Sequence, residues 1–330
     1  RLSQAKAATM PWQPAWTWLD DARAAGPFRR EFSRIRFTSA YRGAIKAADR
    51  AALDADAVAI HVRTGDIVHG KYRRHLVHAS KCIPAVVADE LIARFDGRQV
   101  VVFGQEGHTL DRLCRGGRAV RAEALLPAGL AAAPMALAQI VLMSRAPTAV
   151  AAQSVFASVA ASLAGTLPTQ FTEWIAYDEL PQVIAEGTLR ESWGGDHDAL
   201  AWLTSALARF NSDPESAAED LRRAAVSDPR NPLLPILIAA ALEEAGQPAA
   251  AERELADAVQ RSYDAELGDI ESTVQLRLNR WYLLDEYFGS LERLAGRGMP
   301  TARQLVDVLT ASGYSDRSPA RVITRASAKH

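Results

Sequence analysis

The sequence has little cysteine and almost no net charge. Two cysteines, Cys82 and Cys114, are too few for a disulfide framework, and their separation does not suggest a zinc site. Lysine and arginine total 38 against 39 acidic residues, so the net charge is -1. This balance excludes an overall field that would hold a polyanion, and we expect no nucleic-acid partner.

The sequence also lacks an uninterrupted apolar run of the ~20 residues that a bilayer crossing needs. Between Glu123 and Glu173 the only charged residue is Arg145, but several prolines interrupt the stretch. We interpret it as the buried interior of an α/β domain, whose strands are covered on both faces. We therefore expect a cytoplasmic protein without a transmembrane segment, and leave open peripheral attachment to the inner face of the membrane.

The 330 residues, 48% of them hydrophobic, are enough for about two domains with full cores. Short apolar strands alternate with helices in the first half, which predicts a Rossmann-like, doubly wound parallel sheet. After about residue 190 only helical patterns remain. The predicted domains are an N-terminal helical segment (1–55), a Rossmann-like domain (56–190) and an all-helical domain (191–330). The predicted strands are 57–62, 99–104, 119–121 and 148–151, and the predicted helices of the first half are 38–54, 84–95, 135–144 and 155–163.

The helical half contains an internal repeat of 34 residues. Small and apolar residues recur at this interval: Ala217, Leu221 and Ala224 are matched by Ala251, Leu255 and Ala258. The offsets resemble the tetratricopeptide repeat, in which small residues let two antiparallel helices approach closely. Ala239 and Tyr263 depart from it, because Gly and Pro are common there. We also predict helices at 198–210 and within 268–312.

The string His61-Val62-Arg63-Thr64-Gly65-Asp66 stands where the first predicted strand ends. Ligands bind beyond the carboxyl ends of strands in open parallel sheets. Basic residues follow in the next loop, which favours a phosphate-bearing ligand. An ordinary solvated loop is the alternative. The basic residues are Lys71, Arg73, Arg74 and Lys81.

This His-x-Arg-x-Gly-Asp string resembles the signature of the GT-B fucosyltransferase superfamily, which includes the α1,2-, α1,6- and protein O-fucosyltransferases. Residues 143–156, Met-Ser-Arg-Ala-Pro-Thr-Ala-Val-Ala-Ala-Gln-Ser-Val-Phe, are similar to a later element of these families. The resemblance implies an inverting, metal-independent glycosyltransferase of polysaccharide biosynthesis. The resemblance also implies a nucleotide-sugar donor, GDP-fucose, and a glycan or polysaccharide hydroxyl as the acceptor. No cofactor and no metal ligands are expected.

The resemblance and the charge of the motif assign roles to nine residues. A guanidinium gives bidentate, permanent positive charge to a departing diphosphate, so Arg63 is the main catalytic candidate, with Asp66 beside it as orienting group or base. Ser154 would offer its hydroxyl and the N-terminus of a helix. The substrate-binding candidates are His61, Gly65, Lys71, Arg73, Gly104, Ser154 and Val155.

Each of these roles has a structural alternative. Arg63 could simply pair with Asp66, Ser154 could be a plain helix cap, and His61 could be a core histidine bonded to a backbone carbonyl. The family motif usually has a second arginine where this chain has Thr64. Only 60 residues precede the motif, too few for the acceptor domain of a GT-B enzyme. The chain is then a fragment, or its helical half replaces that domain, or it is a nonfunctional relative; a helical-repeat adaptor that binds a protein partner is the alternative function.

Overall fold

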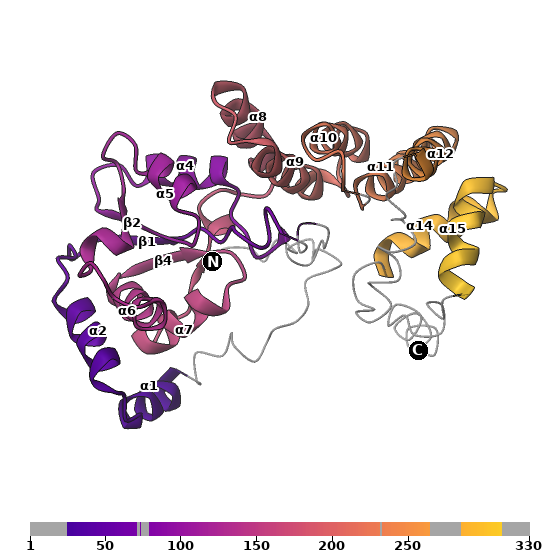
Figure 1. The fold of residues 1–330 in the computed structure, drawn as a ribbon. Helices are drawn as coiled ribbons and strands as arrows, with labels where there is room; N and C mark the ends of the chain where they lie inside the picture. Colours follow the sequence, from indigo (N-terminus) through magenta and orange to yellow (C-terminus); the bar gives the residue numbers. More distant parts are fainter. Residues whose placement is uncertain (1–24, 71–72, 74–78, 232, 265–284, 312–330) are drawn as a thin grey trace, which may run out of the picture. The chain divides into compact units, whose positions relative to one another are not determined.

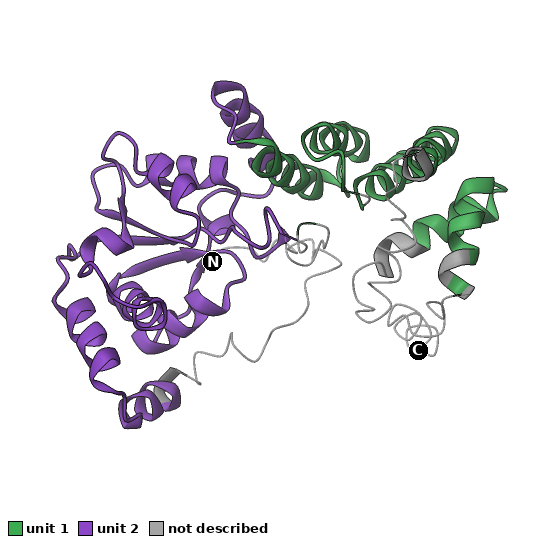
Figure 2. Cartoon of the chain, in the orientation of Figure 1, with its two compact units in different colours: residues 1–13, 73–77, 194–330 green, residues 14–72, 78–193 purple. Residues whose placement is uncertain are grey.

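The computed structural model describes residues 25–70, 73, 79–231, 233–264 and 285–311 (Figure 1). The chain divides into two compact units (Figure 2). The first, which we call the sheet unit, comprises residues 14–72 and 78–193. The second, the helical unit, comprises residues 1–13, 73–77 and 194–330.

The sheet unit contains a five-stranded parallel sheet with the order β3-β2-β1-β4-β5. Every residue of β1 and β2 is buried, as expected for apolar, β-branched strands covered on both faces. In the register of the sheet, His61 at the end of β1 lies between Phe103 and Ala151. The strands are β1 (Val58–His61), β2 (Val100–Phe103), β3 (Val120–Arg121), β4 (Thr148–Ala151) and β5 (Thr169–Gln170).

Helices cover both faces of this sheet (Figure 1). On one face, α2, α6 and α7 pack their alanines and leucines against Ala59, Phe103 and Ala151, and α1 packs on α7. On the other, α4 lies against α5 and α8. Gly187 of α8 has no side chain because a Cβ there would overlap Val86 of α4. The helices are α1 (Ala25–Arg34), α2 (Ser39–Arg50), α4 (Ala85–Arg94), α5 (Gly107–Leu113), α6 (Ala132–Arg145), α7 (Val155–Ala164) and α8 (Leu180–Arg190), with 3-10 turns η3 (Ala122–Leu125) and η4 (Phe171–Glu173).

The helical unit consists of helices that pack on their neighbours in the chain. Pro214 and Pro248, 34 residues apart, begin α10 and α12, and the six repeated small and apolar residues of these two helices are all buried. Arg222 of α10 pairs with Glu254 of α12 at 2.9 Å. The described helices are α9 (Gly195–Arg209), α10 (Pro214–Ser227), α11 (Leu233–Glu244), α12 (Pro248–Asp264), α14 (Asp285–Gly296) and α15 (Pro300–Ala311).

The α/β class of the first half and the helical second half are confirmed, and the four predicted strands are present. The predicted helix 38–54 is shorter, ending at Arg50, and Thr38 stands at its N-cap without a side-chain capping bond. Sequence patterns missed α5, α8 and β5. Part of the predicted helical region 268–312 lies outside the described residues. No helix in the described ranges has the length and apolarity to cross a membrane.

Gly104 lies where the loops that follow β1 and β2 approach each other closely. A Cβ at this position would lie 2.5 Å from the carbonyl oxygen of Val62. We expect Gly104→Ala to lower the free energy of unfolding by about 1–3 kcal/mol, because the overlap is with backbone that must shift. The measurement is urea denaturation of both proteins. Gly43→Ala is the control, since no atom outside its own helix lies within 4 Å of the added methyl group. Helix propensity alone should stabilise α2 by up to about 1 kcal/mol there. Equal changes in the free energy of unfolding for the two substitutions would contradict the predicted overlap at Gly104.

Candidate functional site

The site lies where the strand order of the sheet reverses. From β1 the chain builds outward through β2 and β3, and then returns to place β4 and β5 on the other side of β1. The loops that follow β1 and β4 therefore leave neighbouring strands in opposite directions, which is the ligand-binding point of doubly wound sheets. The motif from His61 to Asp66 follows β1, and Gln153 and Ser154 follow β4. The topology thus brings the two sequence elements to one edge.

Two cations and one carboxylate gather at this edge. The NH2 group of Arg63 lies 3.7 Å from Oδ1 of Asp66, and both side chains are partly exposed. At this distance the contact is an ion pair without a good hydrogen bond, so it contributes little to stability. Lys81 comes from the loop before α4. Burial lowers the pKa of its ammonium group most, and the positive charge of the nearby Arg63 lowers that pKa further. We call Arg63, Asp66, Lys81, Gln153 and Ser154 the switch-point cluster.

The loop that carries Lys81 is anchored to the end of β4. The backbone N–H of Gln153 donates to the carbonyl oxygen of Ser80 at 3.4 Å. Cys82 and Ile83, which follow Lys81 in the chain, are buried. Burial raises the pKa of the Cys82 thiol to about 12, so this cysteine remains an unreactive thiol at neutral pH. Cys82 is therefore an anchor that holds Lys81 at the edge of the sheet.

Ser154 is the N-cap of α7. Its buried hydroxyl oxygen accepts a hydrogen bond from the backbone N–H of Ala157 at 3.3 Å. The capping alternative is thus observed, although the hydroxyl hydrogen can still be donated to a ligand. Val155, the first residue of the helix, is 60% exposed, so the positive end of the α7 dipole is accessible there.

His61 is a buried, neutral ring. It is 8% exposed and stacks on Phe156 of α7, with 5.0 Å between the ring centroids. Burial lowers the pKa of its imidazole to about 4, and the charge of Arg63 acts in the same direction. Its Nδ1 has no hydrogen-bond partner among the described residues, so a bond from this atom to a backbone carbonyl is not observed. The ring forms part of the core beneath the first turn of α7.

The remaining predicted residues lie in different places. Gly65 adopts a left-handed backbone with φ 63°, and Gly104 permits the close approach described above. Lys71 lies outside the described residues. Arg73 belongs to the helical unit, where its Nε donates to Oδ2 of the buried Asp228 at 3.1 Å. The guanidinium of Arg73 is engaged in this ion pair.

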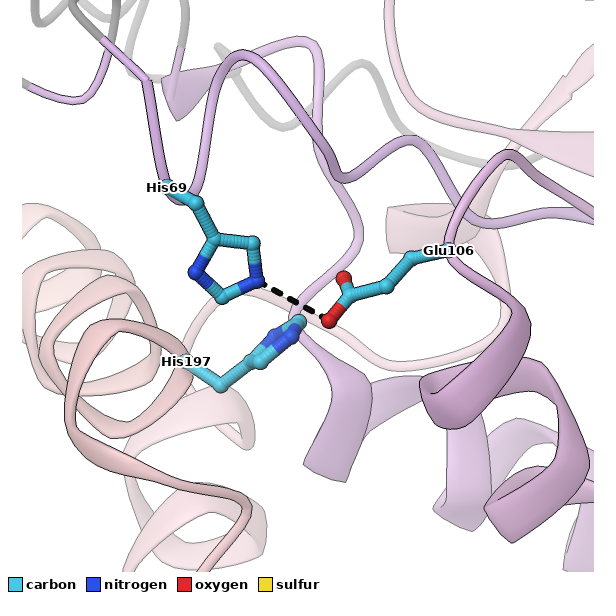
Figure 3. A group of neighbouring side chains, drawn as sticks. All are labelled: His69, Glu106 and His197. Carbon is cyan, nitrogen blue, oxygen red and sulfur yellow. Dashed lines mark hydrogen bonds and ion pairs between the residues drawn. The ribbon is translucent and has the colours of Figure 1, made fainter.

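A second pair of side chains at this edge was not predicted. Nε2 of His69, in the loop after β1, lies 2.9 Å from Oε1 of Glu106, which follows β2 (Figure 3). The sequence placed Lys81 in the basic loop but did not assign it a role of its own, and it gave no indication of Glu106. The available signal was the position of Lys81 and Glu106 in loops next to strand ends; only the order of the strands shows which loops meet.

The sequence contains two Asp-x-Asp pairs, and neither pair belongs to the loops that carry the cluster. Asp54 and Asp56 precede β1, at the opposite edge of the sheet, and Asp56 accepts hydrogen bonds from Arg98 through its backbone oxygen. Asp196 and Asp198 lie in the first turn of α9, in the helical unit. The switch-point cluster itself supplies one carboxylate, Asp66, and two cations, a set suited to an anionic group.

Comparison with known proteins gives no relative from which function could be transferred. No family model, no curated protein and no solved structure matches the chain significantly. The function must therefore be inferred from the chemistry of the site.

Proposed function

We propose that the chain is an inverting glycosyltransferase whose sheet unit binds the diphosphate of a nucleotide-sugar donor at the switch-point cluster. The observation that carries this proposal is that the loops carrying Arg63 and Lys81 and the exposed start of α7 follow the strands at the point where the strand order reverses, with Lys81 near enough to Arg63 to feel its charge. Each of the three favours negative charge, and together they match the several oxygens of a diphosphate.

The reaction develops charge on the leaving group. When the bond between the anomeric carbon and the phosphate oxygen breaks, the electron pair leaves with the nucleoside diphosphate. Arg63 can donate two parallel hydrogen bonds to that group, and Lys81 adds a second fixed charge. Charge stabilisation of this kind can be supplied by side chains without a metal ion. The acceptor hydroxyl attacks from the opposite face of the sugar, which inverts the configuration.

The departure at Thr64 fits this assignment. Fucosyltransferase-like motifs usually carry a second arginine there, but Thr64 is 2% exposed in this chain. A buried position cannot hold an unpaired guanidinium without a large desolvation cost. Lys81 supplies the second cation from the neighbouring loop instead. GDP-fucose is the proposed donor because of the resemblance of residues 61–66 and 143–156 to that superfamily, of whose GT-B fold the sheet unit would be the donor-binding half.

A thermal shift with GDP tests the proposal. At a GDP concentration of about 100 times Kd, binding should stabilise the folded protein by about 2.7 kcal/mol and raise Tm. Arg63→Ala should lose this shift. Arg118→Ala is the matched control, because Arg118 is a similarly exposed arginine that pairs with Asp89 at 2.9 Å, and it should retain the full shift. An equal shift in all three proteins, or none in the wild type, would contradict the proposal.

The helical unit supports a second candidate function, a helical-repeat adaptor whose α/β half does not catalyse. The supporting observation is the 34-residue spacing of α10 and α12 with buried alanines at matching positions, which is typical of tetratricopeptide-like arrays that bind protein partners. Such an adaptor has no reason to bind GDP. The same thermal shift therefore separates the two candidates, since an adaptor should be unaffected by the nucleotide.

A further inference from the structure

His69 and Glu106 form a histidine–carboxylate pair at the carboxyl edge of the sheet. The distance of 2.9 Å between Nε2 and Oε1 is that of a direct hydrogen bond (Figure 3). When the carboxylate accepts the Nε2 proton, the lone pair of the neutral imidazole lies on Nδ1. The His69 side chain is 45% exposed and that of Glu106 is 19% exposed. The pair therefore combines an accessible imidazole with a more enclosed carboxylate that orients it.

Backbone geometry holds the pair next to the switch-point cluster. The N–H of His69 donates to the carbonyl oxygen of Gly65 at 2.8 Å, which closes a turn that begins two residues after Arg63. Glu106 lies two residues beyond Gly104, whose missing side chain allows the loops after β1 and β2 to touch. Arg63 thus lies just before this turn in the chain, and His69 lies at its end. Both residues come from loops at one edge of the sheet.

We propose that His69 is the general base that takes the proton from the acceptor hydroxyl, and that Glu106 is the positioning residue that orients it. This inference rests on the proposed transferase function. An inverting transfer needs a base, because the attacking oxygen loses its proton as it bonds to the anomeric carbon. An imidazole paired with a carboxylate is the usual solution for activating a hydroxyl, since the carboxylate fixes the tautomer and stabilises the imidazolium.

In the proposed step the proton and the electron pair move only between the acceptor, the donor and His69. The acceptor oxygen forms a bond to the anomeric carbon while its proton moves to Nδ1 of His69. The bond from that carbon to the phosphate oxygen breaks, and its electron pair leaves with the diphosphate held by Arg63 and Lys81. The imidazolium, paired with Glu106, then returns its proton to solvent. No oxidant, reductant or metal is required.

Asp66 is the other candidate base, and its surroundings disfavour it. Its carboxylate faces the guanidinium of Arg63 at 3.7 Å, so an acceptor hydroxyl would have to compete with that guanidinium for the carboxylate oxygens. Asp66 is better suited to orienting Arg63.

The test measures GDP release when the full chain is incubated with GDP-fucose, with water as the acceptor. Against the wild type, His69→Gln should lower the rate by about 100-fold or more, the usual contribution of a general base. It should leave the thermal shift with GDP unchanged, because the diphosphate ligands remain. Glu106→Gln should lower the rate in the same direction, and Glu106→Asp should restore part of it. His108→Gln, an exposed histidine two residues beyond Glu106, should have the wild-type rate.

Addition of imidazole to His69→Ala should recover part of the lost rate, which a purely structural role would not allow. The general-base inference is overturned if His69→Gln releases GDP as fast as the wild type, or if imidazole restores nothing. Failure of the wild type to show a thermal shift with GDP overturns the proposed function itself. The two failures are distinguishable because the first is read from the rate and the second from binding.

Discussion

Replacement of Arg63 by alanine should lower the rate of GDP release from GDP-fucose by about 100- to 1000-fold. This is the loss observed when one preorganised donor to a developing negative charge is removed. The rate of Arg63→Lys should lie between those of Arg63→Ala and the wild type, because lysine keeps the charge but loses the planar pair of donors. The rates are measured under identical conditions with Arg118→Ala as the control variant.

The same substitution distinguishes catalysis from a structural ion pair. Arg63 and Asp66 are 3.7 Å apart and partly exposed, so loss of their attraction should change the free energy of unfolding by less than about 1 kcal/mol. Arg63→Ala should therefore remain folded although its rate of GDP release is strongly reduced. A variant that unfolds, or one that is folded and fully active, would show that the guanidinium does not serve the diphosphate.

Acidification should destabilise the sheet unit through His61. The pKa of this buried imidazole is lowered to about 4 in the folded protein, against 6.5 in the unfolded chain. The unfolded state therefore binds the proton first, so the stabilisation is complete above pH 6.5 and is lost as the pH falls toward 4. Between pH 7.5 and 4.5 the loss due to His61 should be about 2–3 kcal/mol.

Hydrogen exchange of the amides in β1 and β2 measures this loss within the sheet unit. His61→Asn, which does not titrate, should show a correspondingly smaller decrease in protection between the two pH values, after correction for intrinsic exchange rates. All other titrating groups are common to the two proteins, so the difference isolates His61. Parallel decreases in both proteins would mean that the imidazole is already charged, or is solvated, in the folded state.

The central strands were predictable because a strand that is buried on both faces appears in the sequence as a short, continuous apolar run. β1 and β2 read Val-Ala-Ile-His and Val-Val-Val-Phe, and all of these residues are buried. By contrast, β5 has two polar residues, Thr169 and Gln170, and is a strand only because β4 lies beside it. Helix α8 contains Gly187, which weakens the helical pattern but is required for contact with Val86. Tertiary packing, and not local propensity, specifies these two elements.

The site was predictable only in its first part. Arg63 and Asp66 are adjacent in the sequence and follow a recognisable strand, whereas Lys81 and Glu106 come from separate loops. Their convergence depends on the strand order, which hydrophobic periodicity does not determine. Arg73 shows a different limit of sequence patterns. Its position in a basic loop predicts a phosphate ligand, but its guanidinium pairs with Asp228 of the helical unit.

The most direct test of the proposed diphosphate site is a crystal structure of the chain with GDP bound. We expect the β-phosphate oxygens to lie within hydrogen-bond distance of the Arg63 guanidinium and the Lys81 ammonium group, close to the first turn of α7. A nucleotide bound elsewhere on the chain, with Arg63 still directed at Asp66, would contradict it.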